Sequence, residues 1–424
     1  MASASVGLDL ADAAKLRVDG ARLWDSLMAM AEIGATAKGG SCRLALTDED
    51  KAGRDLFCRW AEEAGCAITI DSMGNIFARR AGRDAAAAPV ATGSHLDTQP
   101  TGGKFDGVYG VLAGLEVVRR LNELGIETEA PIEIVVWTNE EGARFAPSMI
   151  GSGVFAGVFD QAKAYATRDL EGASLGEELA RIGYRGEEPC GAHPIGAFFE
   201  AHIEQGPILE AEGRTIGAVV GAQGMNWYDV ELTGAESHAG TTPMGRRRDA
   251  YLAAARVADR LAASADAHGP HGVATVGQVQ VFPNSRNTVP GRVAFSVDLR
   301  HPDADALAAM EAAMERALAE VCDPVGIERR VERISAEAPI RFDPACVEAV
   351  RTAAQALGFE PKEMVSGAGH DACFLAAVAP TGMVFVPCAD GISHNEVESA
   401  TPEDLAAGAS VLLQAMLDRA GRVG

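Results

Sequence analysis

Apolar residues in the first third of the chain form short runs that alternate with stretches in which they recur every three or four residues. The runs predict buried strands at 67–70, 75–79, 90–92 and 132–137, and the longer period predicts helices at 47–65 and 107–124. Thr47 before three acidic residues is a typical helix start, and Gly65 is a typical helix end. Alternating strands and helices indicate an α/β fold with a mostly parallel sheet covered by helices on both sides.

The middle of the chain has a different pattern. Strand signals at 216–221, 226–232, 273–282 and 292–299 are interleaved with helix signals at 248–264 and 303–321. This β-α-β-β-α-β order resembles a ferredoxin-like unit. The α/β pattern then returns, with helices that start at Asp343-Pro344 and Thr401-Pro402. We therefore predict one domain formed by 1–212 and 336–424, interrupted by a smaller α+β domain at 213–335.

Composition narrows the range of partners. The 424 residues are 47% apolar and 23% charged, and 37 basic against 60 acidic side chains give a net charge of −23. Such an acidic balance argues against nucleic acid or an anionic membrane surface as the main partner. It does not exclude a small anionic substrate, because one bound cation reverses the local potential.

Targeting and redox signals predict a cytoplasmic protein. The N-terminus lacks the basic start and apolar core of a signal peptide, and no apolar run approaches the roughly 20 residues that span a bilayer. The eight cysteines are scattered and form no CxxC pair, which is typical of reduced thiols.

Four segments place metal-type side chains beside the predicted strands. They are GSHLDTQPTGGKFDG at 93–107, WTNEEGARF at 137–145, EAHIEQGPILE at 200–210 and GISHNEVE at 391–398. In that order they carry His95, Asp97 and Asp106; Glu140 and Glu141; His202; and His394. Sites in open α/β sheets form outside the carboxyl ends of the strands. Histidines and carboxylates without thiolates suit a hydrolytic Zn, Mn, Co or Ni site.

The spacing of these residues suggests which of them bind metal and which support the ligands or face the attacking water. Two metals about 3.5–4 Å apart need a bridging carboxylate, for which Asp106 is the candidate. Asp97, two residues after His95, is expected to orient that imidazole rather than to bind metal. Glu140 and Glu141 point apart if the segment is extended, so one can ligate while the other faces the attacking water. The residues alone leave open ordinary hydrogen-bonded histidines and a helix start at the paired glutamates.

Together these motifs resemble the M20-type dinuclear metallohydrolases, and more narrowly the amidase/hydantoinase-carbamoylase branch. That branch includes N-carbamoyl-L-amino acid hydrolases, β-ureidopropionases and allantoate amidohydrolases. The resemblance extends from about Trp24 to the C-terminal helix. It implies a mixed-sheet, zinc-peptidase-like catalytic domain with an inserted ferredoxin-like lid and dimerisation domain. It also implies two divalent metal ions per subunit and a homodimer formed through the inserted domain.

The resemblance also implies roles for the motif residues. His95, Asp106 and His202 would hold one metal, and Asp106, Glu141 and His394 the other, with Glu140 as the general base. Many M20 peptidases have Asp or Glu at the position of His202, so the histidine favours the carbamoylase branch.

The same resemblance implies substrate contacts. In GAESHAGTTPM at 234–244, His238 would donate to the oxyanion, and in PNSRNTVPG at 283–291, Asn287 would bind the substrate with Arg300. The guanidinium of Arg300 would bind a carboxylate of the substrate through two parallel hydrogen bonds. Gln205 would contact the substrate or support a metal ligand, and SGAGHDA at 366–372 would contact the substrate through Gly369 and His370. A turn at Asn287 and a surface salt bridge at Arg300 are the structural alternatives.

The predicted reaction is hydrolysis of the carbamoyl C–N bond of an N-carbamoyl amino acid, a small ureido-carboxylate, with release of the amino acid, carbon dioxide and ammonia. The alternatives are an allantoate or ureidoglycolate amidohydrolase, an M20 peptidase and a non-catalytic relict of the fold. His202 and the pair Asn287 and Arg300 count against a peptidase, and the presence of every ligand counts against a relict. The sequence does not identify the native metal or the product, nor does it show whether the lid residues act in their own subunit.

Overall fold

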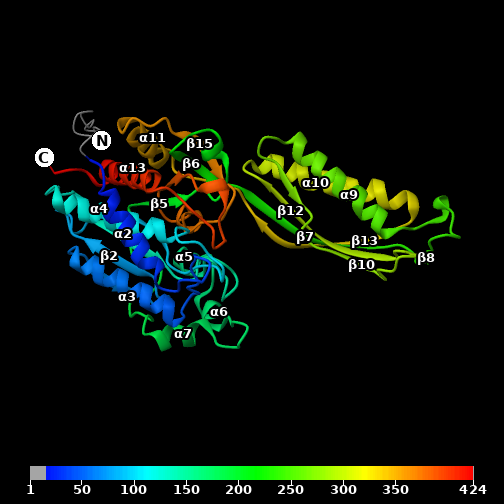
Figure 1. The fold of residues 1–424 in the computed structure, drawn as a ribbon, viewed down its shortest axis with the longest axis horizontal. Coiled ribbons are helices and arrows are strands. Elements are labelled where there is room, and N and C mark those ends of the chain that lie inside the picture. The colour runs from blue at the N-terminus through cyan, green and yellow to red at the C-terminus, as the bar shows by residue number, and fades with distance from the viewer. Residues whose placement is uncertain (1–15, 424) are drawn as a thin grey trace. The chain divides into compact units, whose positions relative to one another are not determined.

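The computed structural model describes residues 16–423. The N-terminal residues, on which the absence of a signal peptide was predicted, lie largely outside this range. The chain forms two compact units (Figure 1): unit 1 is Met1–Val220 with Arg341–Gly424, and unit 2 is Gly221–Ile340. The predicted boundaries at 212/213 and 335/336 fall a few residues earlier. β6 (Gly217–Ala222) pairs with β16 (Thr381–Val386) of the large sheet, which keeps most of β6 in unit 1.

Unit 1 is built on a nine-stranded mixed sheet. Its strands in sheet order are β1 (Ala67–Ile70), β2 (Ile76–Arg80), β4 (Ile132–Trp137), β3 (Val90–His95), β5 (Ala197–Ile203), β16, β6 and β14 (Ile340–Arg341), and β15 (Lys362–Ser366) pairs with β6. The four central strands β4, β3, β5 and β16 are parallel to one another. β1 pairs antiparallel with β2, β2 with β4, and β6 with β16. Every residue of these four strands is buried, as expected for parallel strands with both faces covered.

Helices cover this sheet in two groups: α2, α4, α11 and α13 pack in contact with one another, and α5, α6, α7 and α12 form a second connected group. Figure 1 shows α11 and α13 near β6 and α3 near β2, at the other end of the strand order. Asp343 and Thr401 cap α11 and α13 through hydrogen bonds from backbone amides, and Thr47 caps α3 in the same way. The helices are α2 (Gly20–Ala31), α3 (Asp48–Glu63), α4 (Val108–Glu123), α5 (Ile150–Phe155), α6 (Gln161–Ala166), α7 (Leu175–Ile182), α8 (Ile208–Ala211), α11 (Pro344–Ala356), α12 (Asp371–Leu375) and α13 (Pro402–Ala420).

Unit 2 has the predicted ferredoxin-like order. Its antiparallel sheet runs β10-β12-β7-β13, with β9 also paired to β12. One face of β7 and β12 is buried against α9 and α10, and the other face is more exposed, so burial alternates along both strands. The elements are β7 (Gly224–Thr233), α9 (Ala250–Ala267), β9 (Val273–Thr275), β10 (Val279–Phe282), β12 (Arg292–His301), α10 (Ala304–Cys322) and β13 (Glu328–Glu337). The single strand predicted at 273–282 is therefore two strands.

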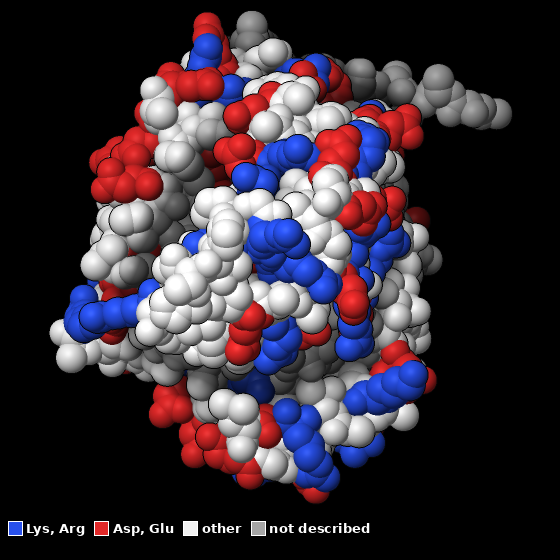
Figure 2. Space-filling model, turned by 90° about the vertical axis from the view of Figure 1, so that its right-hand side faces the viewer, with Lys and Arg blue, Asp and Glu red and all other residues white. Residues whose placement is uncertain are grey.

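The basic run Arg246–Arg248 belongs to a unit that is acidic overall. Residues 221–340 contain twelve arginines, no lysine and sixteen carboxylates, so this unit contributes only −4 to the net charge of −23. Figure 2 shows a face on which Lys and Arg side chains lie interspersed with Asp and Glu side chains. The guanidinium of Arg247 donates to the carbonyls of Ala239 and Thr242, which makes it part of the local loop structure.

Among residues 16–423, no helix combines the length and the apolar composition needed to cross a bilayer.

Candidate metal centre and active site

The four parallel strands bring the sequence motifs to one edge of the unit 1 sheet. His95 is the last residue of β3, and His202 is the next-to-last residue of β5. Glu140 and Glu141 follow β4, and the segment carrying His394 follows β16. Because parallel strands end at the same edge, residues separated by up to 300 positions in sequence converge there.

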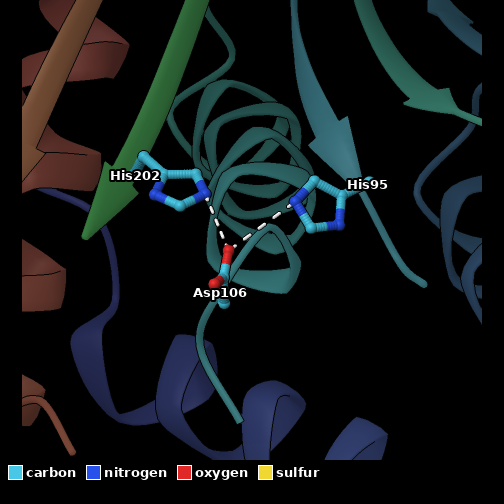
Figure 3. A group of neighbouring side chains, drawn as sticks. All are labelled: His95, Asp106 and His202. Carbon is cyan, nitrogen blue, oxygen red and sulfur yellow. Dashed lines mark ion pairs between the residues drawn. The ribbon is translucent and has the colours of Figure 1, made fainter. Parts of the chain in front are cut away.

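Asp106 is the centre of this convergence. Its Oδ1 atom lies 3.1 Å from Nε2 of His202 and 3.7 Å from Nε2 of His95 (Figure 3). Its Oδ2 atom lies 3.3 Å from Nε2 of His394, which in turn is 3.4 Å from Oε2 of Glu141. The ligand atoms of His95, Asp106 and His202 all lie within 4.8 Å of one another, as do those of Asp106, Glu141 and His394. The two carboxylate oxygens of one residue thus face two separate groups of donors.

Backbone contacts prepare the histidine rings to accept a cation. Nδ1 of His95 is 2.8 Å from the carbonyl of Asp97, and Nδ1 of His202 is 2.9 Å from the carbonyl of Ile203. A carbonyl can only accept, so Nδ1 carries the proton and Nε2 presents a lone pair. The amide of Gly107 donates to Nε2 of His202, which agrees with this tautomer. Gly107 has φ +67°, and a Cβ there would lie 2.2 Å from Cε1 of His95, so glycine is required for this close approach.

The adjacent glutamates face different histidines. Oε2 of Glu140 lies 3.4 Å from Nε2 of His95, whereas Oε2 of Glu141 faces His394 and also accepts from Nε2 of Gln99 at 2.7 Å. The backbone turns here, and Asn139 has φ +57°.

Asp97 acts through two different groups. It contacts the imidazole of His95 as expected, and the contact is made by the backbone carbonyl of Asp97. The buried carboxylate accepts hydrogen bonds from the amides of Glu140 and Glu141, each at 3.2 Å. Asp97 therefore ties the end of β3 to the turn that carries both glutamates.

Electrostatics favour a bound cation at this centre. Burial, then the charge of Asp106, raises the pKa of Glu141 to about 8. Burial and neighbouring carboxylates also raise the pKa of Glu140. Burial opposes protonation of His202, but its hydrogen bond with Asp106 outweighs this and raises its pKa to about 9, so without a cation Nε2 holds a second proton. A bound cation would replace that proton and leave the neutral ring with its proton on Nδ1. The buried carboxylates have too few positive charges near them, and a bound cation would supply this charge. Imidazole and carboxylate ligands suit Zn²⁺ and similar ions. The residues present therefore fit the predicted metals.

The remaining predicted residues of unit 1 lie around the same centre. Nε2 of Gln205 donates to Oδ2 of Asp106 at 2.8 Å, so this side chain supports a predicted metal ligand directly. The ring of His370 is buried 4.6 Å from that of His202, and its Nε2 is 2.9 Å from the hydroxyl of Ser366. Gly369 packs beside Met149, whose terminal methyl would be 3.0 Å from an added Cβ.

The predicted substrate residues of unit 2 fall in two places. His238 lies in β8 (Ser237–His238), which pairs with β11 (Thr288–Val289) directly after Asn287. Both side chains are exposed. Nδ1 of His238 accepts from the amides of Gly240 and Thr241, so its Nε2 carries the proton and can donate.

Arg300 lies apart from this ribbon, on β12 of the main sheet of unit 2. Its guanidinium bonds to the carboxylate of Asp298, with Nη2 2.8 Å from Oδ2. This is the local salt bridge that the sequence left as the alternative, and a role in substrate binding stays a prediction.

Two buried carboxylates beside the predicted ligands, Glu200 and Glu398, carry no sequence signal of their own. Glu200 accepts from the hydroxyl of Ser94 and the amide of Ala372, and with His202 and His370 it forms a third group of donor atoms within 4.8 Å of one another. Glu398 accepts from the amides of Phe105 and Asp106. Glu200 lies two residues before His202, and Glu398 lies four residues after His394. Both accept from backbone amides, and no sequence spacing marks a glutamate that does so.

Comparisons with known proteins agree with this geometry. Residues 91–418 match the model of peptidase family M20/M25/M40. An N-carbamoyl-L-amino-acid amidohydrolase of Rhizobium meliloti is 53% identical, with 95% of this chain and 97% of that protein covered. One from Geobacillus stearothermophilus is 40% identical, with 93% and 97% covered. A crystal structure of an amidase of the hydantoinase/carbamoylase family from Burkholderia multivorans is 63% identical with a TM-score of 0.94, covering 96% of this chain and 99% of that one. This chain belongs to the peptidase M20/M25/M40 family.

Proposed function

We propose that this chain is a metal-dependent amidohydrolase that cleaves the carbamoyl C–N bond of N-carbamoyl-L-amino acids. The observation that carries the proposal is the placement of the two Asp106 oxygens between two donor groups, with Glu140 beside them. The names of the two similar curated proteins support the choice of substrate class.

The metal ligands follow from the two donor groups. His95, Asp106 and His202 would hold one divalent cation, and Asp106, Glu141 and His394 would hold a second, with Zn, Mn, Co and Ni all compatible. When bound, such cations supply Lewis-acid polarisation of the scissile carbonyl and make a nearby water more acidic. Asp97 and Gln205 support these ligands without joining them, through His95 and Asp106.

Glu140 is the general base. It takes the proton of the water as the water oxygen attacks the ureido carbon, and it returns that proton to the departing nitrogen. Its raised pKa, caused by burial and neighbouring carboxylates, makes it a stronger base than an exposed glutamate. The products are the free amino acid and carbamic acid, which decomposes to carbon dioxide and ammonia.

Substrate recognition is assigned to the residues that the family pattern implies. Arg300 and Asn287 bind the carboxylate of the substrate, and the free Nε2–H of His238 donates to the oxyanion. Gly369 and His370 contact the substrate from unit 1. The support is the family pattern together with the exposed, donor-competent ring of His238.

We also infer that the protein is a cytoplasmic homodimer formed through unit 2. Unit 2 exposes large apolar side chains on its strands, including Trp227 at 42% and Ile334 at 52%, as expected of an interface. All eight cysteines are free thiols, in keeping with a reducing compartment.

The test is ammonia release from purified protein given Mn²⁺ or Zn²⁺, with N-carbamoyl-L-methionine, N-carbamoyl-β-alanine and allantoate in parallel. Preferred turnover of N-carbamoyl-L-methionine is expected. Preference for allantoate would move the assignment to that branch, and no release from any of the three by metal-loaded protein would refute the proposal.

A further inference from the structure

Glu398 is a buried carboxylate that the proposed mechanism does not use. It is only 5% exposed and lies in the segment after β16, four residues beyond His394. Its Oε1 atom accepts from the backbone amides of Phe105 and Asp106, at 2.9 Å and 3.1 Å. Its Oε2 atom accepts from the hydroxyl of Ser393 at 2.9 Å. One side chain thus connects the segment that carries Asp106 with the segment that carries His394.

The contacts extend to the Asp106 carboxylate itself. The hydroxyl of Ser393 is 2.8 Å from Oδ2 of Asp106, and Nε2 of Gln205 is 2.8 Å from the same oxygen. Ser393 has a single hydroxyl proton and two carboxylates within reach, Asp106 and Glu398. If a cation takes a lone pair of Oδ2, the hydroxyl can turn to Glu398 without losing a hydrogen bond.

The turn before Asp106 leaves space for this carboxylate. A Cβ on Gly103 would lie 2.0 Å from Cδ of Glu398 and 2.1 Å from its Oε1. Non-bonded heavy atoms cannot come this close, so only glycine at 103 allows Glu398 to reach the two amides. Gly103 therefore forms one wall of the Glu398 site.

We propose that Glu398 is a positioning residue that locks the Asp106 segment to the His394 segment, so that Asp106 presents one oxygen to each donor group. The role rests on the proposed function, because it concerns how the two predicted metals share one carboxylate. Two buried amides and a hydroxyl converge on the Glu398 carboxylate, and an anion is the strongest acceptor for such donors. Without it, both amides stay buried and unpaired, and the Asp106 segment can shift away from His394.

The experiment compares three variants with the wild type. Glu398→Ala removes the acceptor, and Glu398→Gln keeps an oxygen for the two amides. Glu116→Ala is the matched control, because Glu116 is a fully buried carboxylate that accepts from the amide of Asp19 and from Arg22. It lies eight residues beyond Val108, the first residue of α4, which is about 12 Å along the helix at 1.5 Å per residue.

Metal affinity is measured by competition of Zn²⁺ with a chromophoric chelator, alongside the melting temperature of metal-free protein and the separate values of kcat and KM. Glu398→Ala should bind one of its metal equivalents about 10- to 100-fold more weakly, the usual effect of losing a residue that supports a ligand. Its kcat should fall more than its KM rises. Glu398→Gln should recover most of the affinity, and Glu116→Ala should melt earlier but bind metal as the wild type does.

Wild-type metal affinity in Glu398→Ala would overturn the inference and leave the proposed function intact. A Glu398→Gln variant that binds metal as weakly as Glu398→Ala would do the same. The inference would also be overturned if the metal affinity of Glu116→Ala decreased in proportion to the decrease in its melting temperature. The effect of Glu398→Ala would then be general destabilisation. Wild-type protein that binds no Zn²⁺ would instead overturn the proposed function together with this inference.

Discussion

Replacing Asp97 with asparagine tests whether its carboxylate holds the turn that carries the general base. The two carboxylate oxygens accept from the amides of Glu140 and Glu141 at 3.2 Å each. An asparagine offers one oxygen and one NH2 group, so one of these buried amides would face a donor. Losing a hydrogen bond to a charged acceptor costs about 1.5–3 kcal/mol, and a buried unpaired amide costs about 1–3 kcal/mol more.

The two costs together exceed about 2.5 kcal/mol. If this whole free energy is lost from transition-state stabilisation because Glu140 moves, kcat/KM decreases by roughly a hundredfold, since each 1.36 kcal/mol is about a factor of ten. The assay is ammonia release at saturating Mn²⁺, together with metal content. Asp71→Asn is the matched control, because Asp71 is also buried and accepts from the amides of Met73 and Asn75 in the β1–β2 turn. It should lose stability and keep its turnover. Wild-type turnover in Asp97→Asn would refute the reasoning.

Three further predictions follow from the same structure. Glu140→Gln should bind metal normally but turn over about 10²–10⁴-fold more slowly, the usual share of a general base, and near-normal turnover measured by ammonia release would contradict that role. Arg300→Lys should mainly raise KM, because lysine cannot make two parallel hydrogen bonds to a carboxylate; loss of metal in this variant would contradict its assignment to the substrate. Burial opposes protonation of His193, but the hydrogen bond and charge of Glu133 outweigh it and raise its pKa above 6.5. The stability advantage of wild type over His193→Gln in denaturant titrations should therefore be full below about pH 6.5 and shrink as pH rises through the raised value, and a pH-independent difference would exclude this ion pair.

The strands that carry the site could be predicted because they are short apolar runs. β1 and β4 occupy the predicted 67–70 and 132–137, and the predicted strand at 90–92 continues as β3 to His95. β13 is the last strand of the predicted β-α-β-β-α-β order, but its position could not be predicted from its own residues. Nine of its ten residues are exposed, and the segment alternates charged and apolar residues only in part. It is held by backbone pairing with β7, which leaves no hydrophobic signal of its own.

The same distinction applies to the site. His95, Asp106, Glu141, His202 and His394 could be picked out because their chemistry and their positions after strands are visible in sequence. The contacts of Asp97 and Glu398 could not, because their partners are backbone amides that every residue possesses. For Glu398 those amides are also 292 and 293 positions away, so only the folded chain brings them together.

The most direct test of the account is a metal titration of chelator-treated protein, with bound Zn²⁺ or Mn²⁺ and ammonia release from N-carbamoyl-L-methionine measured on the same samples. The account predicts two equivalents per chain, no activity in the metal-free protein, and activity that returns as both equivalents bind. Full turnover in protein stripped of metal, or a single equivalent unaffected by removal of His394, would contradict it.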